Sequence, residues 1–160
     1  MRPLTALLLL ALPSLLACTA PRRQAFDPAG YAPFAVPGSS AIEGRGRVQD
    51  DSGSWHDIAG REVILGPVTP YAEEWWQRVV LGDEDLGPPD PRLAPYLRTV
   101  IADADGGFRF AGLPAGDYFL TCDVTWTSAG LEGRFVMHGA WLHERVSVRP
   151  DTTVRIDIGP

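Results

Sequence analysis

Acidic residues and glycines are concentrated in residues 103–118, which read DADGGFRFAGLPAGDY. Asp103 and Asp105 have the spacing of the first and third ligands of a calcium-binding loop. The fifth position is Gly107 and the twelfth is Pro114, where such a loop needs a bidentate glutamate. Two carboxylates cannot satisfy a cation that takes about six to eight oxygens. The alternative is a hairpin turn in which an aspartate accepts hydrogen bonds from nearby backbone amides and a glycine adopts positive φ. We therefore predict a structural turn here and no metal site.

The three histidines and the serines do not show the spacing of a metal or catalytic site. His138 and His143 are five residues apart, so on one strand their side chains point to opposite faces. His56 can join either of them only through folding, whereas zinc or iron needs about three or four convergent ligands. No serine stands in a G-x-S-x-G elbow. We expect no catalytic residue, no metal and no cofactor, and a metal-dependent enzyme is the third of our functional hypotheses.

Five tryptophans provide candidates for binding, because exposed aromatic rings stack on sugars or anchor protein partners. Trp75 and Trp76 are adjacent and would lie about 100° apart on a helix, so one of them can remain partly exposed. We take both as candidate partner-binding residues. Core packing is the alternative for every tryptophan, and we expect it for Trp126, Trp141 and at least one of the adjacent pair.

A sugar ligand would use a different set of aromatic side chains. The candidate sugar-stacking residues are Trp55, His56 and Tyr71. Carbohydrate or peptidoglycan binding through them is the alternative to binding a protein partner. A glycan pull-down separates the two hypotheses, because a sugar-binding module retains its ligand without any protein partner.

Alternation of apolar and polar residues identifies the strands that must position these side chains. The clearest example is 117–126, where Leu120, Cys122 and Val124 share one face. Cys122 is therefore predicted to be a buried, unreactive thiol. Similar short runs, separated by glycine and proline turns, predict further strands at 42–48, 61–66, 97–102, 134–142, 146–148 and 154–158. Seven to eight short strands indicate an all-β, antiparallel β-sandwich.

One segment interrupts the strand pattern. Apolar residues between 72 and 80 recur at helical spacing, Thr69 suits the N-cap, and Pro70 suits the first helical position. This predicts a short inserted α-helix at about 70–81. Residues 83–95 are acidic and proline-rich, so we expect a surface loop there. Helix and loop together form the insertion, residues 67–96, which is our candidate contact surface.

The first residues have the features of an export signal. Arg2 precedes an apolar run from Leu4 to Leu16, which is shorter than the ~20 residues of a membrane span. The run ends in LLAC and resembles the lipobox of bacterial lipoproteins. This resemblance implies a signal peptide at 1–17, acylation of Cys18 and a membrane as a partner. Because Thr19 stands where the inner-membrane signal has aspartate, the resemblance implies the outer membrane.

Residues 18–40 contain prolines and glycines without periodicity, so we predict a lipid-anchored, extended tether leading to a domain at 41–160. Phe26, Tyr31 and Phe34 are the residues of the tether that can dock locally. Without residues 1–17, 13 arginines remain against 20 acidic residues, a net charge of −7. Nucleic acid needs a basic surface, so we exclude it as a partner.

Several segments resemble the carboxypeptidase regulatory-like domain, a transthyretin-like (prealbumin-like) β-sandwich. They are IEGRGRV (42–48), REVILGP (61–67), DADGGFRFAGLPAGDYFL (103–120) and VSVRPDTTVRIDI (146–158). The third segment has one glycine more than the shortest form of the family motif. The resemblance implies the fold and carries no activity with it. We expect a non-enzymatic, lipid-anchored cell-envelope protein whose sandwich is a structural or protein-binding module.

Overall fold

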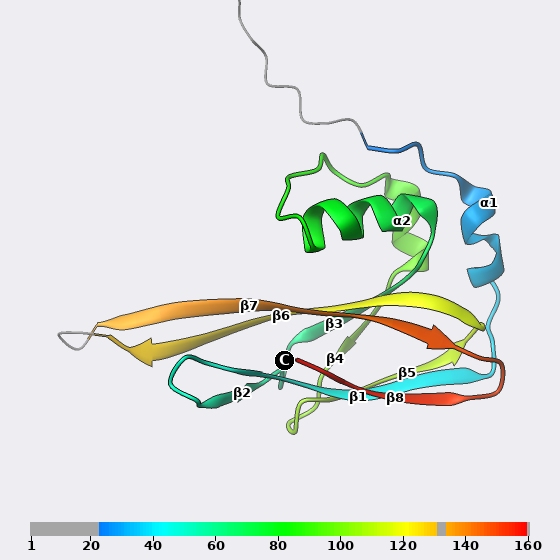
Figure 1. Ribbon diagram of the computed structural model, residues 1–160. Helices are drawn as coiled ribbons and strands as arrows, with labels where there is room; N and C mark the ends of the chain where they lie inside the picture. Colours follow the sequence, from blue (N-terminus) through cyan, green and yellow to red (C-terminus); the bar gives the residue numbers. More distant parts are fainter. Residues whose placement is uncertain (1–22, 131–133, 160) are drawn as a thin grey trace, which may run out of the picture.

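Eight strands form two four-stranded sheets in the computed structural model, which describes residues 23–130 and 134–159 (Figure 1). The first sheet contains β1 (Ser40–Gln49), β2 (Trp55–Asp57), β5 (Gly107–Leu113) and β8 (Thr153–Ile158). The second has the order β4 (Arg98–Ile101), β3 (Glu62–Pro67), β6 (Gly116–Ala129) and β7 (Phe135–Val148). Paired strands are antiparallel except β1 and β8, which are parallel. The prediction of an all-β, transthyretin-like sandwich with one short inserted helix is confirmed.

The core lies between the two sheets and consists of side chains that alternate along each strand. On β6, Leu120, Cys122 and Val124 are almost completely buried, as their shared face predicted. They belong to one apolar cluster with Ile42 of β1 and Phe110 of β5. Burial of this cluster supplies the main force that holds the sheets together.

Cys122 is a free cysteine in the middle of this core. Burial raises the pKa of its thiol from 9.0 to about 11. At pH 8 this lowers the fraction of reactive thiolate about a hundredfold relative to the unfolded chain. We expect a thiol reagent to label Cys122 at least about a hundredfold more slowly in the native protein than in the urea-unfolded protein. The Cys122→Ser variant measures the labelling that does not come from Cys122. Fast labelling of native Cys122 would contradict its burial.

Two strands differ from the sequence pattern. The strands predicted at 134–142 and 146–148 form the single strand β7, which begins at Phe135, because the polar residues between them stay paired with β6. His143 and Arg145 contact the helical layer outside the sheet and so do not interrupt the strand. β2 lies between the strands predicted at 42–48 and 61–66, in a polar segment without strand periodicity, and its three residues pair with the end of β1.

The glycine-rich stretch from β4 to β6 connects the two sheets twice. Asp103 accepts a hydrogen bond from the backbone amide of Gly107, and Gly106 has a φ of 70°. The expected aspartate turn is present, but it is not a hairpin, because β4 and β5 belong to different sheets. At the second connection, the Tyr118 hydroxyl donates to the Pro114 carbonyl over 2.8 Å. This bond fixes the corner from which the chain enters β6.

A helical layer covers part of the outer face of the second sheet (Figure 1). Helix α2 (Pro70–Trp75) begins after Thr69, whose hydroxyl oxygen accepts an amide hydrogen from the first turn. The chain continues as a π-helical turn, Trp76–Val80. The helix predicted at 70–81 is therefore present, with a wider last turn.

The part of β6 below the helical layer, residues 118–122, is buried on both faces. Phe119 and Thr121, which alternate with the core residues, are also buried. Trp76 stacks on Phe119 with 4.3 Å between ring centroids. The loop predicted at 83–95 needs a correction, because Pro91–Tyr96 form a 3-10 helix that begins where the Asp90 side chain accepts a backbone amide hydrogen.

Residues 23–39 pack on the domain, with Phe26 and Tyr31 against the insertion, so the tether prediction needs a correction here. They contain helix α1 (Pro28–Tyr31) and a 3-10 turn, Ala32–Phe34. Tyr31 is 0% exposed and stacks on Phe26, and both rings belong to a small cluster with Tyr71 of α2. The segment has the composition of a tether, but burying its aromatic rings holds it in place.

The signal peptide predicted at 1–17, the acylated Cys18 and the first residues of the tether lie outside the described residues. Among residues 23–130 and 134–159, no helix combines the length and the apolar character needed to cross a bilayer.

Candidate functional site

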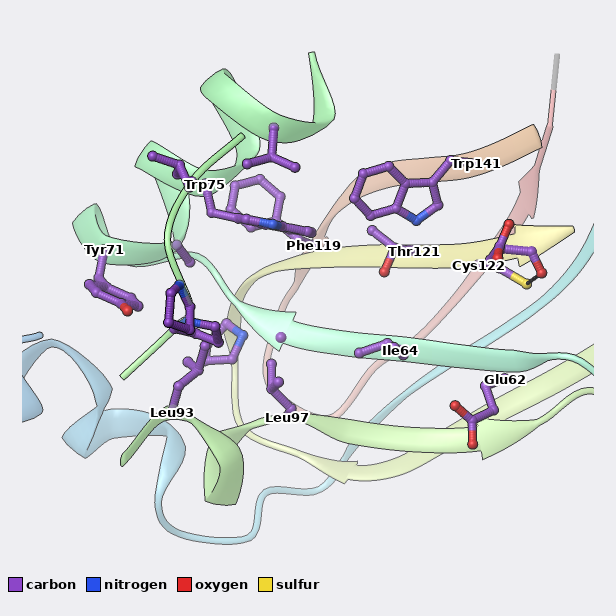
Figure 2. A pocket seen from close by; sticks show the side chains of 18 of the residues that line it. Glu62, Ile64, Tyr71, Trp75, Leu93, Leu97, Phe119, Thr121, Cys122 and Trp141 are labelled. Atoms are coloured by element: carbon purple, nitrogen blue, oxygen red, sulfur yellow. Dashed lines mark hydrogen bonds between the residues drawn. The ribbon is translucent and has the colours of Figure 1, made fainter. Parts of the chain in front are cut away.

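A groove of about 630 Å³ lies between the insertion and the outer face of the second sheet (Figure 2). Strands β3, β6 and β7 contribute one side of its lining, with Ile64 and Thr121 among the side chains. Helix α2 and residues 85–89 contribute the other side, and Arg23 of the N-terminal segment also lines it. The groove exists because the insertion stands over the sheet, so the strand pattern alone does not reveal it.

Two tryptophans meet in the groove. The rings of Trp75 on α2 and Trp141 on β7 lie edge to face, with 5.7 Å between centroids (Figure 2). Trp141 is 42% exposed, so our expectation of core packing for it is wrong. Trp141 and His143 point to the same, outer face of β7. Trp76 of the helical layer covers His143, whereas Trp141 lies beyond the covered part and lines the open groove. An open indole face next to a second indole suits a flat, partly apolar ligand.

Two carboxylates lie on the outer face of the second sheet, in a row that starts at Trp141. Asp123 pairs in register with Trp141, and Val63 pairs with Cys122, which places Glu62 next to Asp123 on the outer face. Neither carboxylate forms an ion pair within the described part of the chain. Both are exposed and line the groove, so their oxygens are free to accept hydrogen bonds from a ligand.

The Arg61 side chain is held at the same end of the groove. Its Nη2 donates to the backbone carbonyl and to the hydroxyl oxygen of Thr125, each over 2.7 Å. These bonds fix the guanidinium close to β6 without neutralising it. The groove thus offers an aromatic corner, acceptors and one oriented donor group, which is the usual composition of a small-ligand site.

The two candidate partner-binding residues have different environments. Trp75 lines the groove and is half-buried. Trp76 is 6% exposed, stacked on Phe119 and in edge contact with His143, so it is a packing residue and not a surface anchor. The sequence predicted that one of the pair stays accessible, and the docking of the helix decides which one.

Tyr71 is not an exposed sugar-stacking residue, which corrects that prediction. It is 5% exposed and lies against Phe26 in an edge-to-face contact. Its hydroxyl oxygen accepts hydrogen bonds from Arg23 and from the backbone amide of Asp90. Tyr71 therefore closes one part of the groove and joins the N-terminal segment to the insertion.

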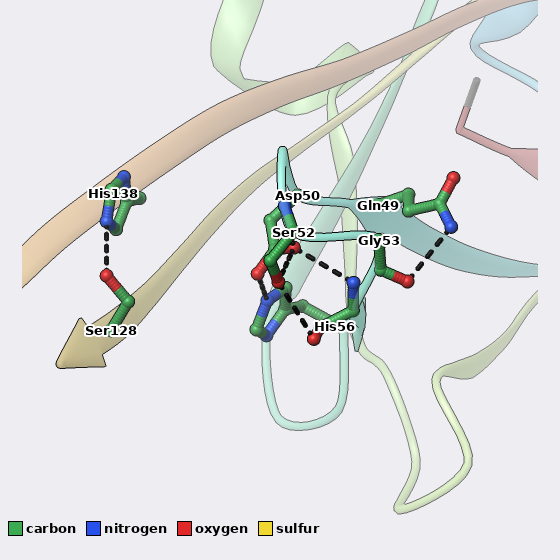
Figure 3. Close-up of polar contacts among 8 residues, drawn as sticks. Gln49, Asp50, Ser52, Gly53, His56, Ser128 and His138 are labelled. Carbon is green, nitrogen blue, oxygen red and sulfur yellow. Dashed lines mark hydrogen bonds and ion pairs between the residues drawn. The ribbon is translucent and has the colours of Figure 1, made fainter.

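Trp55 and His56 lie on β2, in the sheet that does not form the groove, so the three sugar-stacking candidates do not form one site. Trp55 is 48% exposed, and the Arg47 guanidinium covers its ring at 4.2 Å. His56 Nε2 lies 2.8 Å from Asp50 Oδ2 (Figure 3). The hydrogen bonds from His56 and then Ser52 hold the pKa of the Asp50 carboxyl well below its usual range. This arrangement stabilises the turn after β1.

Trp126 connects the two sheets at this end of the sandwich. His56 stacks on one side of its ring at 4.9 Å, and the β7 residue His138 stacks at 5.5 Å. Figure 3 shows that His138 is also bonded to Ser128, over 2.8 Å. The sequence does not predict that His56 and His138 stack on the same tryptophan, because this arrangement depends on how the two sheets pack. Within residues 23–130 and 134–159, no three His, Cys, Asp or Glu side chains gather as a metal site would require.

No protein-family model and no curated protein matches the sequence. Among solved structures, the chain is similar to a candidate carbohydrate-binding protein from Pseudomonas aeruginosa, with 25% identity and a TM-score of 0.74. The match covers 86% of this chain and 99% of that protein. The two chains therefore share a fold over nearly their whole length.

Weaker similarities concern pilins. The minor pilin of Streptococcus agalactiae is 16% identical, with a TM-score of 0.41 over 78% of this chain and 44% of the pilin. The major pilin subunit of Bacillus cereus is 16% identical, with a TM-score of 0.37 over 78% of this chain and 31% of the pilin.

Proposed function

We propose that this protein is a non-enzymatic carbohydrate-binding module and that the groove beside Trp141 holds the sugar. The observation that carries the proposal is the exposed Trp141 ring, with Trp75 at its edge, Asp123 next to it on β6 and Glu62 beyond Asp123 on β3. The apolar face of a sugar ring stacks on an indole, while its hydroxyls donate to carboxylates. The similarity to the candidate carbohydrate-binding protein supports this choice over a protein partner.

The proposal keeps the lipid anchor expected from the sequence. The LLAC sequence at 15–18 supports acylation of Cys18, which would hold the module at the outer membrane. Two or more acyl chains anchor a protein far more firmly than one. A module held in this way would keep a cell-envelope glycan, such as peptidoglycan, close to the lipid surface.

Replacement of Trp141 by alanine tests the proposal. Glycans and peptidoglycan fragments retained by the parent protein should bind Trp141→Ala at least about tenfold more weakly, because a stacking anchor is lost. Since the ring is partly exposed, the free energy of unfolding should change by less than about 1 kcal/mol. Binding is measured by titration calorimetry and stability by urea denaturation.

Trp55→Ala is the matched control, because Trp55 is exposed to a similar extent (48% against 42% for Trp141) but lies on the other sheet. Its glycan affinity should equal that of the parent. Loss of affinity in Trp55→Ala but not in Trp141→Ala would move the site away from the groove. If the parent retains no glycan, the carbohydrate proposal is wrong.

A further inference from the structure

Strand β7 is an edge strand with an uncovered apolar segment. It ends the second sheet, and the β6–β7 hairpin extends beyond the rest of the sandwich (Figure 1). Phe135 is 82% exposed, Met137 is 76% exposed, and Val136 between them is also exposed. An edge strand presents unpaired backbone amides and carbonyls, and monomeric proteins usually protect such edges with proline, lysine or a covering element. β7 contains no proline or lysine.

We propose that β7 pairs antiparallel with β7 of a second copy of this chain, about a two-fold axis at Gly139. The two four-stranded sheets would then join into one continuous sheet of eight strands. This inference does not rest on carbohydrate binding, since it concerns the edge of the sheet and not the ligand.

The apolar side chains favour this register. With Gly139 opposite Gly139, Met137 lies opposite Trp141 of the second copy, and Val136 lies opposite its Leu142. Directly opposite side chains are in contact, and an aliphatic or sulfur-containing side chain packs well against an indole. Met137 and Val136 of each copy are therefore covered by the other copy. Shifting the centre by one residue towards the C-terminus would set Val136 opposite the charged Glu144.

Charges favour the same register. It places Arg134 of each copy opposite Glu144 of the other, so two ion pairs form across the two-fold axis. Within the described residues, neither side chain has an ion-pair partner in its own chain. Glu144 is half-buried and follows Leu142 on the inner side of the edge strand. An inward charge of this kind normally hinders edge pairing, and an arginine from the second copy removes the obstacle.

The pairing would also complete the groove. Trp141 lines the groove, and Met137 of the second copy would lie directly beside it. Each copy would thus contribute a side chain to the margin of the other copy's groove. The dimer therefore presents two grooves on one face of a shared sheet.

Cysteine substitution on the two-fold axis tests the register. In an antiparallel pair, residues directly opposite have Cα atoms about 4.5–5.5 Å apart, within the range that a disulfide spans. A Cβ at position 139 meets only ordinary contacts, so Gly139→Cys should fold normally. The purified full chain carrying Gly139→Cys should form a disulfide-linked dimer under mild oxidation, seen on a non-reducing gel. The parent chain measures the background from its own cysteines.

Met137→Cys is the matched control, because the two copies of residue 137 would lie about 13 Å apart along the strands. It should not crosslink alone, whereas the double variant Met137→Cys, Trp141→Cys should. A monomeric Gly139→Cys, or a Met137→Cys that crosslinks equally well, would overturn the proposal.

Charge reversal provides an independent test. Arg134→Glu and Glu144→Arg should each weaken dimerisation about tenfold or more in sedimentation equilibrium, because like charges face each other twice. The double variant restores opposite charges and should return to within about threefold of the parent. If the double variant is as weak as the single variants, Arg134 and Glu144 do not face each other.

Discussion

Replacement of Tyr31 by alanine is expected to lower the free energy of unfolding by about 3 kcal/mol, although the surrounding sequence has the composition of a tether. The Tyr31 ring is completely buried, stacks on Phe26 at 4.8 Å and lies against Tyr96 at 4.8 Å. Its removal leaves a cavity between the N-terminal segment and the insertion. Urea denaturation followed by tryptophan fluorescence measures the change. An unchanged midpoint would mean that residues 23–39 are a tether after all.

Tyr31→Phe is the matched control, because it keeps the ring and removes only the hydroxyl. That hydroxyl lies near Thr69, but within the described residues it makes no hydrogen bond of acceptable geometry. Burial raises the pKa of this phenol. A buried hydroxyl without a partner is unfavourable, so Tyr31→Phe should leave stability unchanged or raise it by up to about 1 kcal/mol. A measurable loss of stability in Tyr31→Phe would show that the hydroxyl does form a hydrogen bond with Thr69.

Trp76→Ala is expected to cost about 3–5 kcal/mol of stability, whereas Trp75→Ala should cost about 1 kcal/mol. Trp76 lies flat on Phe119, with an interplanar angle of 10°, and is buried between the helix and the sheet. Trp75 is half-buried at the groove, where water replaces the lost ring. The comparison therefore separates the packing role of the insertion from its binding role.

Ligand binding provides the second measurement for this pair. Trp75→Ala should weaken glycan binding while the fold remains intact, since Trp75 supports the Trp141 ring. Equal stability losses in the two variants would mean that the insertion contacts the sheet differently from the structure described above. If Trp76→Ala leaves stability unchanged, the helical layer adds nothing to the fold.

Strands and their buried faces could be predicted from the sequence because strand periodicity is a local property. The alternation through Leu120, Cys122 and Val124 predicts which side of β6 faces the core, and Thr69 with Pro70 predicts where the helix begins. These features depend on residues within a few positions of each other. The structure confirms them.

The groove could not be predicted, because it depends on contacts between distant segments. Trp141 looks like a core residue from its alternation, yet the relevant face of β7 is the one that the insertion covers only in part. The prediction of an extended tether is wrong for residues 23–39 for the same reason. Prolines and glycines are typical of a tether, but Phe26 and Tyr31 pack against the distant residue Tyr71. Only the tertiary arrangement supplies these partners.

The parallel pairing of β1 with β8 has a consequence for how the protein folds. Residues 41–46 pair with residues 153–158, more than a hundred positions later, so the first sheet is incomplete until β8 is available. Contacts of such large sequence separation make folding slow, in the range of about milliseconds to seconds. While β8 is missing, residues 41–46 of β1 have no partner strand on one side, and this edge of the first sheet stays unpaired. The first sheet therefore closes only after β8 has been made.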